Sequence, residues 1–296
     1  MKIQCFGARF YGGQVQRIEH GFENFGEKVL PSSNTEIVPD LIYCNDAENY
    51  DNSIKLHNHF NKTPKLILNC LDLPYWLNNF DDILKEYKQK FALADRITCI
   101  SKAVQNQIQQ YLGISSDVVY IPIKDVYLDE NIKPPKPIFL LYVGRANDIR
   151  KNFKLIVDTL RDCGISSSNL TVVGSENPRY GQYLGVVSDA QLNEIYNKSS
   201  FLLLPSFFEG AGLSALEASV CGCVPILCSN NPISKEFYPN EFIAEPTIRG
   251  YGDKIFELLN NYNKSRELAL EYGKKYSQQF SGLQIAKNII GVFETL

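Results

Sequence analysis

The sequence predicts an α/β protein built from two halves, each a parallel β-sheet covered by helices. Short apolar runs alternate with longer helix-like segments through all 296 residues. No hairpin signal joins one apolar run to the next, which favours parallel over antiparallel pairing. The composition changes at residues 131–137, NIKPPKP, where three prolines in four residues cannot continue a helix or a central strand.

The proline-rich segment is interpreted as the linker between two domains. At roughly 100–200 residues per domain, a chain of this length should form two. We expect an N-terminal domain over residues 1–133 and a second domain over 138–278. Residues 279–296 have the apolar spacing of a closing helix, and packing back on the N-terminal domain is one option for it.

The expected strands are apolar runs of four to six residues. They are Ile3–Phe6, Leu41–Cys44, Lys65–Cys70, Arg96–Ile100 and Val118–Ile121 in the first half, and Ile138–Val143, Leu170–Val173, Phe201–Leu204 and Pro225–Cys228 in the second. Among the expected helices are Lys102–Leu112, Phe153–Arg161, Asp189–Lys198 and Ser214–Cys221. Because ligands of open parallel sheets sit at the carboxyl ends of strands, the loops after these strands are the places to look for a site.

Bulk composition narrows the partners and the setting. The formal net charge of −3 gives no electrostatic reason to expect nucleic acid as a partner. Five of the eight cysteines lie in apolar, strand-like runs, which is typical of reduced thiols in a cytoplasmic protein. The close pair Cys221 and Cys223 lacks a second pair at zinc-site spacing, so no metal is expected.

Neither a signal peptide nor a membrane span is expected. The stretch MKIQCFGARF has no apolar core of signal-peptide length, and no run approaches the roughly 20 apolar residues of a membrane span. The sequence therefore predicts a cytoplasmic protein, for which peripheral membrane attachment stays open.

Two loops after predicted strands combine glycine with features that suit an anion. Gly12 and Gly13 precede a helix-like segment, where glycine lets the backbone approach a ligand and the helix amides can face an anion. Gly144, Arg145 and Lys151 follow the strand that ends at residue 143, and two cations there can neutralise a diphosphate. A tight turn and a solvated basic turn are the alternatives.

A third loop, PSFFEGAGLSALEASVCGCVP, combines two carboxylates with a glycine-rich helix start. Amides from Gly212 to Ser214 would point at a ligand in front of the helix. Glu209 and Glu217 could each accept hydrogen bonds from vicinal sugar hydroxyls. A phosphate centre with a sugar at each end describes a nucleotide sugar.

Each feature of this loop also has another interpretation. Ser214-x-x-Glu217 matches a capping box, in which the glutamate only closes the helix start. Glu209 could be an exposed loop acid. Gly210-x-Gly212-x-x-Ala215 fits a dinucleotide fingerprint, but the next strand, PILC, is followed by Ser-Asn-Asn and not by an acid.

Taken in order along the chain, these segments resemble the retaining glycosyltransferases of family GT4, which have the GT-B fold. The signature E-x7-E corresponds to Glu209 and Glu217. The other similar segments are ADRITCISKAVQNQI, VVYIPI, YVGR with RKN, and TVVGSENPRYGQYLGVVSDAQLNEIYNKSSFLLLPS. The resemblance covers most of the chain from about Pro39 onward and is strongest across 138–230. It implies two Rossmann-like domains that face each other across a cleft, with a compact N-terminal domain.

The resemblance also implies roles for the loop residues. Arg145 and Lys151 would bind the diphosphate and stabilise the leaving group in the donor loop that begins at Gly144. Glu209 would contact the transferred sugar, and Glu217 would hold the ribose hydroxyls. The residues expected to make backbone contacts are Gly210, Ala211, Gly212, Leu213 and Ser214 to sugar and phosphate, Gly12 and Gly13 to the diphosphate, and Gly185, Val186 and Val187 near the nucleobase.

The implied reaction moves a sugar from a UDP- or GDP-sugar to an acceptor hydroxyl with retention and without metal or other cofactor. Positioning and stabilisation of the leaving diphosphate would be the main contribution of the protein. On the acceptor side, Asn45 and Asp46 stand where the family often has histidine, and Asp72 matches a position that is often His-Asp. These departures leave three kinds of acceptor as alternatives, namely a glycan, a lipid-linked molecule or a small molecule. Two alternatives remain: a nucleotide-sugar-binding protein without turnover, and a nicotinamide-dependent oxidoreductase.

Overall fold

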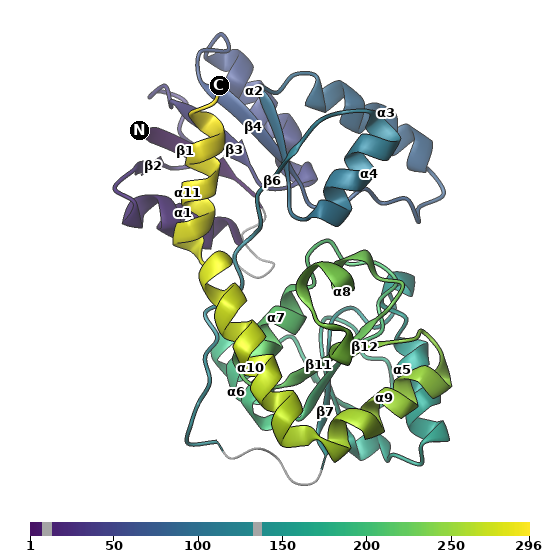
Figure 1. Cartoon of the computed structure of the whole chain (residues 1–296). Coiled ribbons are helices and arrows are strands. Elements are labelled where there is room, and N and C mark those ends of the chain that lie inside the picture. Colours follow the sequence, from purple (N-terminus) through teal and green to yellow (C-terminus); the bar gives the residue numbers. More distant parts are fainter. Residues whose placement is uncertain (8–13, 133–137) are drawn as a thin grey trace. The chain divides into compact units, whose positions relative to one another are not determined.

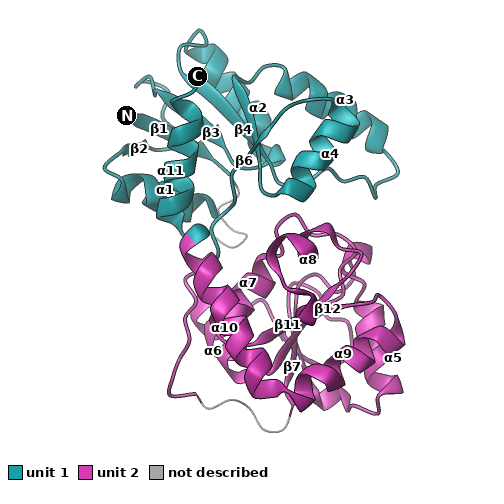
Figure 2. Ribbon diagram, in the orientation of Figure 1, with its two compact units in different colours: residues 1–124, 279–296 teal, residues 125–278 magenta. Residues whose placement is uncertain are grey.

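The computed structural model describes residues 1–7, 14–132 and 138–296, and it has the predicted α/β architecture. The chain forms two compact units, coloured separately in Figure 2. Unit 1 comprises Met1–Lys124 together with Gln279–Leu296, and unit 2 comprises Asp125–Gln278. The division falls after Lys124, ahead of the proline-rich segment, of which residues 133–137 lie outside the described part of the chain.

The sheet of unit 1 has six parallel strands in the order β2-β1-β3-β4-β5-β6. The strands are β1 (Lys2–Phe6), β2 (Lys28–Leu30), β3 (Leu41–Cys44), β4 (Lys65–Cys70), β5 (Arg96–Cys99) and β6 (Asp117–Val118). The four inner strands are buried except for the first residue of β1, β4 and β5, as expected for a parallel sheet with both faces covered, whereas β2 and β6 at the edges are mostly half-buried or exposed. The chain moves from β1 to one side and from β3 to the other, so the topological switch point lies between β1 and β3.

Helices cover both faces of this sheet, as Figure 1 shows. They are α1 (Gln14–Asn24), the 3-10 helix η1 (Ala47–Asn49), α2 (Tyr50–His59), α3 (Phe80–Phe91), α4 (Lys102–Leu112) and α11 (Gly282–Phe293). Right-handed crossovers place α2, α3 and α4 on the face opposite α1. The C-terminal α11 lies beside α1, and a Cβ on Gly21 would sit 2.1 Å from the carbonyl oxygen of Gly282.

The sheet of unit 2 is also parallel and has the order β12-β11-β10-β7-β8-β9. The strands are β7 (Leu140–Val143), β8 (Leu170–Val173), β9 (Gln182–Gly185), β10 (Phe201–Leu204), β11 (Val224–Cys228) and β12 (Ile243–Ala244). β7 and β10 are neighbours, but the chain leaves them in opposite directions, toward β8 and toward β11. The switch point of this sheet therefore lies between β7 and β10.

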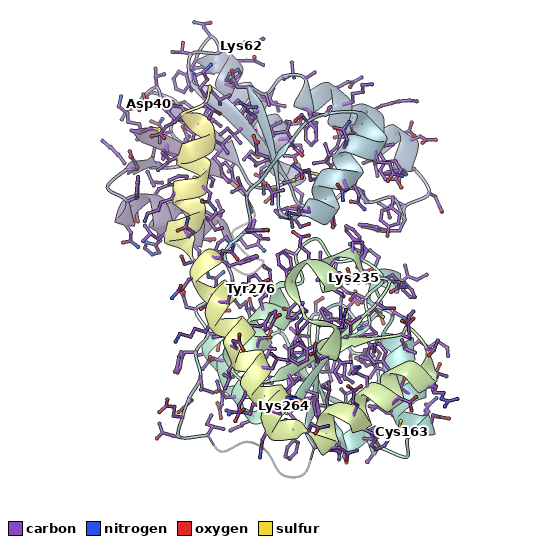
Figure 3. All side chains as sticks on the ribbon, viewed as in Figure 1. Asp40, Lys62, Cys163, Lys235, Lys264 and Tyr276 are labelled. Carbon is purple, nitrogen blue, oxygen red and sulfur yellow. The ribbon has the colours of Figure 1, made fainter. Side chains whose placement is uncertain are left out.

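Helices also cover both faces of the sheet in unit 2. They are η2 (Ile149–Lys151), α5 (Phe153–Asp162), η3 (Ser167–Asn169), α6 (Asp189–Lys198), α7 (Leu213–Val220), α8 (Pro232–Phe237), η4 (Asn240–Phe242), α9 (Ile248–Asn260) and α10 (Tyr262–Gln279). α5 and α9 share one face, and right-handed crossovers put α6, α7 and α8 on the other. On α10, Tyr276, labelled in Figure 3, packs edge-on against Phe237 of α8 with 5.6 Å between ring centroids.

Most predicted elements are confirmed within a residue or two, and the differences concern edges. Leu41–Cys44, Lys65–Cys70, Leu170–Val173 and Phe201–Leu204 have the predicted bounds. The strand predicted over 118–121 is reduced to Asp117–Val118, and the helix predicted from Ser214 begins at Leu213. The short strands β2, β9 and β12 were not predicted. Within the part of the chain that the structure describes, no helix is both long and apolar enough to cross a membrane.

Candidate functional site

The loops after β7 and β10 lie together at the switch point of the unit 2 sheet. β10 is paired with β7 through Phe201 and Leu140 and through Leu202 and Leu141, so their carboxyl ends point the same way. The segments that leave the two strands run in opposite directions, so a ligand at this point could contact both loops. These loops and the helices that follow them carry four charged residues that the sequence analysis names: Arg145, Lys151, Glu209 and Glu217.

Lys151 and Glu209 form a closed ion pair across this switch point. Nζ of Lys151, the last residue of η2, donates to both carboxylate oxygens of Glu209, at 2.6 and 2.7 Å. The side chains are only 17% and 12% exposed. Glu209 is therefore not the exposed loop acid that one interpretation of the sequence allowed.

Asp148 fixes the rest of the loop that carries Lys151. Its Oδ2 accepts from Nη2 of Arg150 at 2.6 Å and from Nη2 of Arg145 at 3.0 Å, and its Oδ1 accepts from Nε of Arg150. Burial opposes ionisation of Asp148, but the hydrogen bonds and charges of the arginines outweigh it and hold the pKa of Asp148 below its usual value. Arg150 is thus largely buried, whereas the side chain of Arg145 is 58% exposed and can reach a ligand.

The helix start after β10 presents backbone amides, as predicted. Gly212 is the N-cap of α7 with φ of 61°, and as a glycine it has no side chain that could cap the N-terminal amides of Leu213 and Ser214. The positive φ favours glycine here, and a Cβ at this position would lie 2.5 Å from Cδ1 of Ile233, so the isoleucine side chain would also have to move. Since Ser214 lies inside the first turn and is not the N-cap, the capping-box interpretation of Glu217 is wrong.

Glu217 instead points into the interior of unit 2. It is 5% exposed, and its Oε2 accepts a hydrogen bond of 3.1 Å from the hydroxyl of Tyr196 in α6. Burial and the Glu217 carboxylate raise the pKa of Tyr196 well above its usual value, so the phenol stays protonated and donates. The carboxylate is thereby held in a fixed orientation one helical turn below the amides of α7.

Three glycine backbones meet at the ends of β7, β8 and β9. The amide of Gly144 donates to the carbonyl of Val173, and the amide of Gly174 donates to the carbonyl of Gly185. A Cβ on Gly174 would lie 2.0 Å from the carbonyl oxygen of Gly144, so the backbones are in direct contact. Beyond Gly185, which has φ of 74°, the side chain of Val186 is 78% exposed and Val187 is half-buried.

The acceptor-side residues predicted in the first half lie at the carboxyl ends of β3 and β4 in unit 1. Asn45 and Asp46 follow β3 and are buried, and the Asp46 carboxylate accepts from the side-chain amide of Asn49 at 2.8 Å. Asp72, two residues after the end of β4, is partly exposed. Gly7 directly follows β1, and a Cβ there would lie 3.1 Å from Cβ of Asn45. Gly12 and Gly13 lie outside the described residues.

A chain of buried side-chain hydrogen bonds holds Asn45. The side-chain amide of Asn69 in β4 donates to Oδ1 of Asn45 at 3.3 Å, and Oγ1 of Thr98 in β5 donates to Oδ1 of Asn69 at 2.9 Å. All three side chains are buried. These hydrogen bonds run from β5 through β4 to the residue after β3, and they fix the orientation of the Asn45 side chain.

Sequence reasoning missed Asp148, Tyr196 and Gly174. Asp148 had a visible signal, because it is the one acid within the basic run RANDIRK. Gly174 also had a signal, since it directly follows a predicted strand. Tyr196 had none, because only the packing of α6 on α7 brings its hydroxyl to Glu217. Among the described residues, no group of three or more His, Cys, Asp or Glu side chains could hold a metal ion.

Comparison with solved structures identifies the fold. The whole chain superposes on a sucrose-phosphate synthase from Thermosynechococcus elongatus with a TM-score of 0.79 and 15% identity, covering 98% of that chain. It also superposes on Anabaena HepE in complex with UDP-glucose, with a TM-score of 0.74 and 16% identity over the whole of both chains. Two six-stranded parallel sheets with these neighbours define a protein of the GT-B type.

Sequence comparison then gives the family. The model of the family described as "Glycosyl transferases group 1" matches residues 123–276, which is more than half of the chain. The chain belongs to this family of glycosyltransferases.

Curated relatives agree with the family. An uncharacterized glycosyltransferase of Methanocaldococcus jannaschii is 27% identical over 225 residues, which cover 71% of this chain. The O-antigen chain mannosyltransferase B of Escherichia coli is 32% identical over 117 residues, which cover 39% of this chain. The matches span 62% of the archaeal relative and 30% of the bacterial one.

Proposed function

We propose that this protein transfers a sugar from a nucleotide sugar to an acceptor hydroxyl with retention of anomeric configuration, as a GT4-type enzyme with an E-x7-E motif. The observation that carries the proposal is the Lys151–Glu209 pair at the switch point of the unit 2 sheet, beside the open amides of α7. This arrangement supplies a cation for a phosphate and a carboxylate for sugar hydroxyls at one place. The UDP-glucose bound in the complex of Anabaena HepE makes UDP the first nucleotide to test.

Positions in unit 2 support parts for several of the residues predicted from the sequence. Lys151 and the exposed Arg145 would bind the diphosphate, and the amides of Leu213 and Ser214 would add hydrogen bonds to it or to the sugar. Glu217, held by Tyr196, would accept hydrogen bonds from the ribose hydroxyls. The exposed Val186, next to Gly185, would lie against the nucleobase.

The chemistry that follows needs positioning more than acid–base groups. The bond from the anomeric carbon to the diphosphate oxygen breaks, and the acceptor oxygen bonds to the same face of that carbon. The acceptor proton passes to the departing phosphate oxygen. Lys151 and Arg145 would stabilise the negative charge that develops on the diphosphate, and for this reason we propose that no metal ion is required.

The proposal also covers the cellular compartment in which the protein works. The eight cysteines are free thiols, and all but Cys163 are buried, which suits a reducing, cytoplasmic environment. Burial raises the pKa of the Cys44 thiol to about 12 and that of Cys228 to about 11, so these thiols are unreactive. Peripheral membrane attachment would be compatible with the absence of a spanning helix from the described residues.

A two-stage experiment tests the proposal. Thermal unfolding with UDP-, GDP- and ADP-sugars should reveal one nucleotide that stabilises the protein by about 2.7 kcal/mol at 100 times its Kd. With that nucleotide sugar, wild type should hydrolyse or transfer the sugar, and Lys151→Ala should lower turnover by about 10²-fold. Lys198→Ala, which removes an exposed lysine paired with Glu194 on α6, is the matched control and should leave turnover unchanged.

The outcomes separate the alternatives. Nucleotide binding by wild type with no turnover on any nucleotide sugar would favour a binding protein without catalysis. Stabilisation by a nicotinamide dinucleotide but by no nucleoside diphosphate would favour an oxidoreductase and contradict the proposal.

A further inference from the structure

The Lys151–Glu209 pair has a property that bears on ligands other than the nucleotide sugar. The ammonium of Lys151 carries three N–H donors, and two of them are directed at the oxygens of Glu209, at 2.6 and 2.7 Å. A phosphate that takes more than the one remaining donor of Lys151 must therefore compete with this carboxylate.

The competition is strong because the pair is mostly buried. With side chains only 17% and 12% exposed, solvent compensates either charge poorly if the other moves away. A diphosphate beside Lys151 would also face a second negative charge, the carboxylate of Glu209, at hydrogen-bonding distance from the same ammonium. An anion thus gains the full charge and hydrogen-bonding capacity of Lys151 only if Glu209 finds other hydrogen-bond partners.

A nucleotide sugar and a free nucleoside diphosphate differ in whether they can provide those partners. The hydroxyls of the sugar can donate to both oxygens of a carboxylate. A free nucleoside diphosphate has no donor beyond its last phosphate. The first ligand can replace both halves of the ion pair, whereas the second replaces only one half.

We propose that the Lys151–Glu209 pair is a selectivity switch, which opens for the nucleotide sugar and closes against the free nucleoside diphosphate. This inference rests on the proposed function and concerns regulation of the same site. After transfer, the carboxylate loses its sugar partners and returns to Lys151, which weakens the hold on the product and speeds its release. Glu209 is therefore a determinant of specificity between substrate and product.

The test compares wild type with Glu209→Gln, which keeps the size of the side chain and removes its charge. Titration calorimetry would use UDP with UDP-glucose and GDP with GDP-mannose, and the pair that binds wild type is carried forward. For Glu209→Gln we expect the Kd of the free nucleoside diphosphate to fall at least about fivefold, because Lys151 no longer has an anionic competitor. The Kd of the sugar ester should stay the same or rise, because the neutral amide is a poorer acceptor for hydroxyls.

A matched control removes an equal charge elsewhere in unit 2. Glu194→Gln breaks the exposed pair with Lys198 on α6, and the affinities for both ligands should remain those of wild type. If Glu209→Gln cannot be purified folded, Glu209→Asp takes its place. Its side chain is one methylene shorter, so the ion pair with Lys151 should be weaker. The Kd of the free nucleoside diphosphate should therefore fall, as it should in Glu209→Gln.

Two results would overturn the inference in distinguishable ways. If wild type binds a nucleotide sugar and its nucleoside diphosphate, but neither Glu209 variant binds the diphosphate more tightly, the switch is wrong and the proposed function stands. If wild type binds none of the UDP-, GDP- or ADP-sugars of the thermal-unfolding panel and none of their nucleoside diphosphates, the proposed function fails and the switch fails with it.

Discussion

The hydroxyl of Tyr196 in α6 donates a 3.1 Å hydrogen bond to Oε2 of Glu217 in α7, and both side chains are buried. This contact ties the second glutamate of the E-x7-E pattern to a neighbouring helix, while the first glutamate, Glu209, is held by Lys151. The two carboxylates are therefore fixed by different partners on different elements. Changes at each partner should have separate effects.

Removal of the Tyr196 hydroxyl should cost stability and weaken nucleotide binding. Tyr196→Phe leaves a buried carboxylate without this donor, so the free energy of unfolding should fall by about 1–3 kcal/mol. Affinity for the nucleoside diphosphate should also fall several-fold, because Glu217 loses its fixed orientation. Urea denaturation and titration calorimetry measure the two effects. Tyr127→Phe, at an exposed tyrosine of the same unit, should change neither.

The contact between Gly174 and Gly144 predicts that a single methyl group disturbs the loop of Arg145. In Gly174→Ala the new Cβ would overlap the carbonyl oxygen of Gly144, with only 2.0 Å between them, and the loop must shift. We expect a loss of unfolding free energy of about 1–3 kcal/mol, typical of overpacking, together with weaker nucleotide binding.

A second glycine gives the control for this change. A Cβ on Gly291 in α11 meets no atom within 4 Å, so Gly291→Ala should be neutral or stabilise the helix by up to about 1 kcal/mol. A wild-type melting temperature for Gly174→Ala would show that the close approach of the two backbones does not exist.

Asp148 anchors the loop that carries Arg145 and Lys151, and this should make the free energy of unfolding depend on pH. The pKa of Asp148 is lowered from 3.8 in the folded protein, so its ionised form is the one that stabilises the fold. The contribution is fully present above pH 3.8 and is lost as the pH falls below that value through the folded-state pKa. The difference in unfolding free energy between wild type and Asp148→Asn should be constant near neutral pH and shrink below pH 3.8. A difference that grew on acidification would refute this role.

Two arginines of the same loop should behave differently on mutation. Arg150 makes three hydrogen bonds to Asp148 through its side chain and backbone and is largely buried, so Arg150→Ala should mainly lower stability. The exposed Arg145 makes one contact to Asp148, so Arg145→Ala should raise the Kd of the nucleoside diphosphate about tenfold with little change in stability. Calorimetric titration and chemical denaturation on both variants give the comparison, and equal behaviour would contradict the assignment.

Much of the fold was predictable because buried parallel strands are continuous apolar runs. Phe201–Leu204 and Lys65–Cys70 were bounded correctly from this signal alone. The missed strands lie at or near sheet edges and lack it: Lys28–Leu30 has three residues, and Gln182–Gly185 alternates between exposed and half-buried positions. Their pairing depends on neighbouring strands more than on their own side chains.

The site was predictable to the level of loops but not of contacts. The topology of parallel sheets makes strand ends the place for charged and glycine residues, and these positions were singled out in the sequence. The contact between Lys151 and Glu209 was not, because 58 residues separate them and only the packing of β10 beside β7 brings them together. The same holds for Tyr196 and Glu217, whose contact depends on how α6 and α7 pack.

A crystal structure with bound UDP-glucose or GDP-mannose would show directly which groups hold the diphosphate of the donor. We expect the diphosphate to lie at the carboxyl ends of β7 and β10, in contact with Nζ of Lys151 and the guanidinium of Arg145. Density for the diphosphate at another place, with Lys151 still on both oxygens of Glu209 and Arg145 directed into solvent, would contradict it.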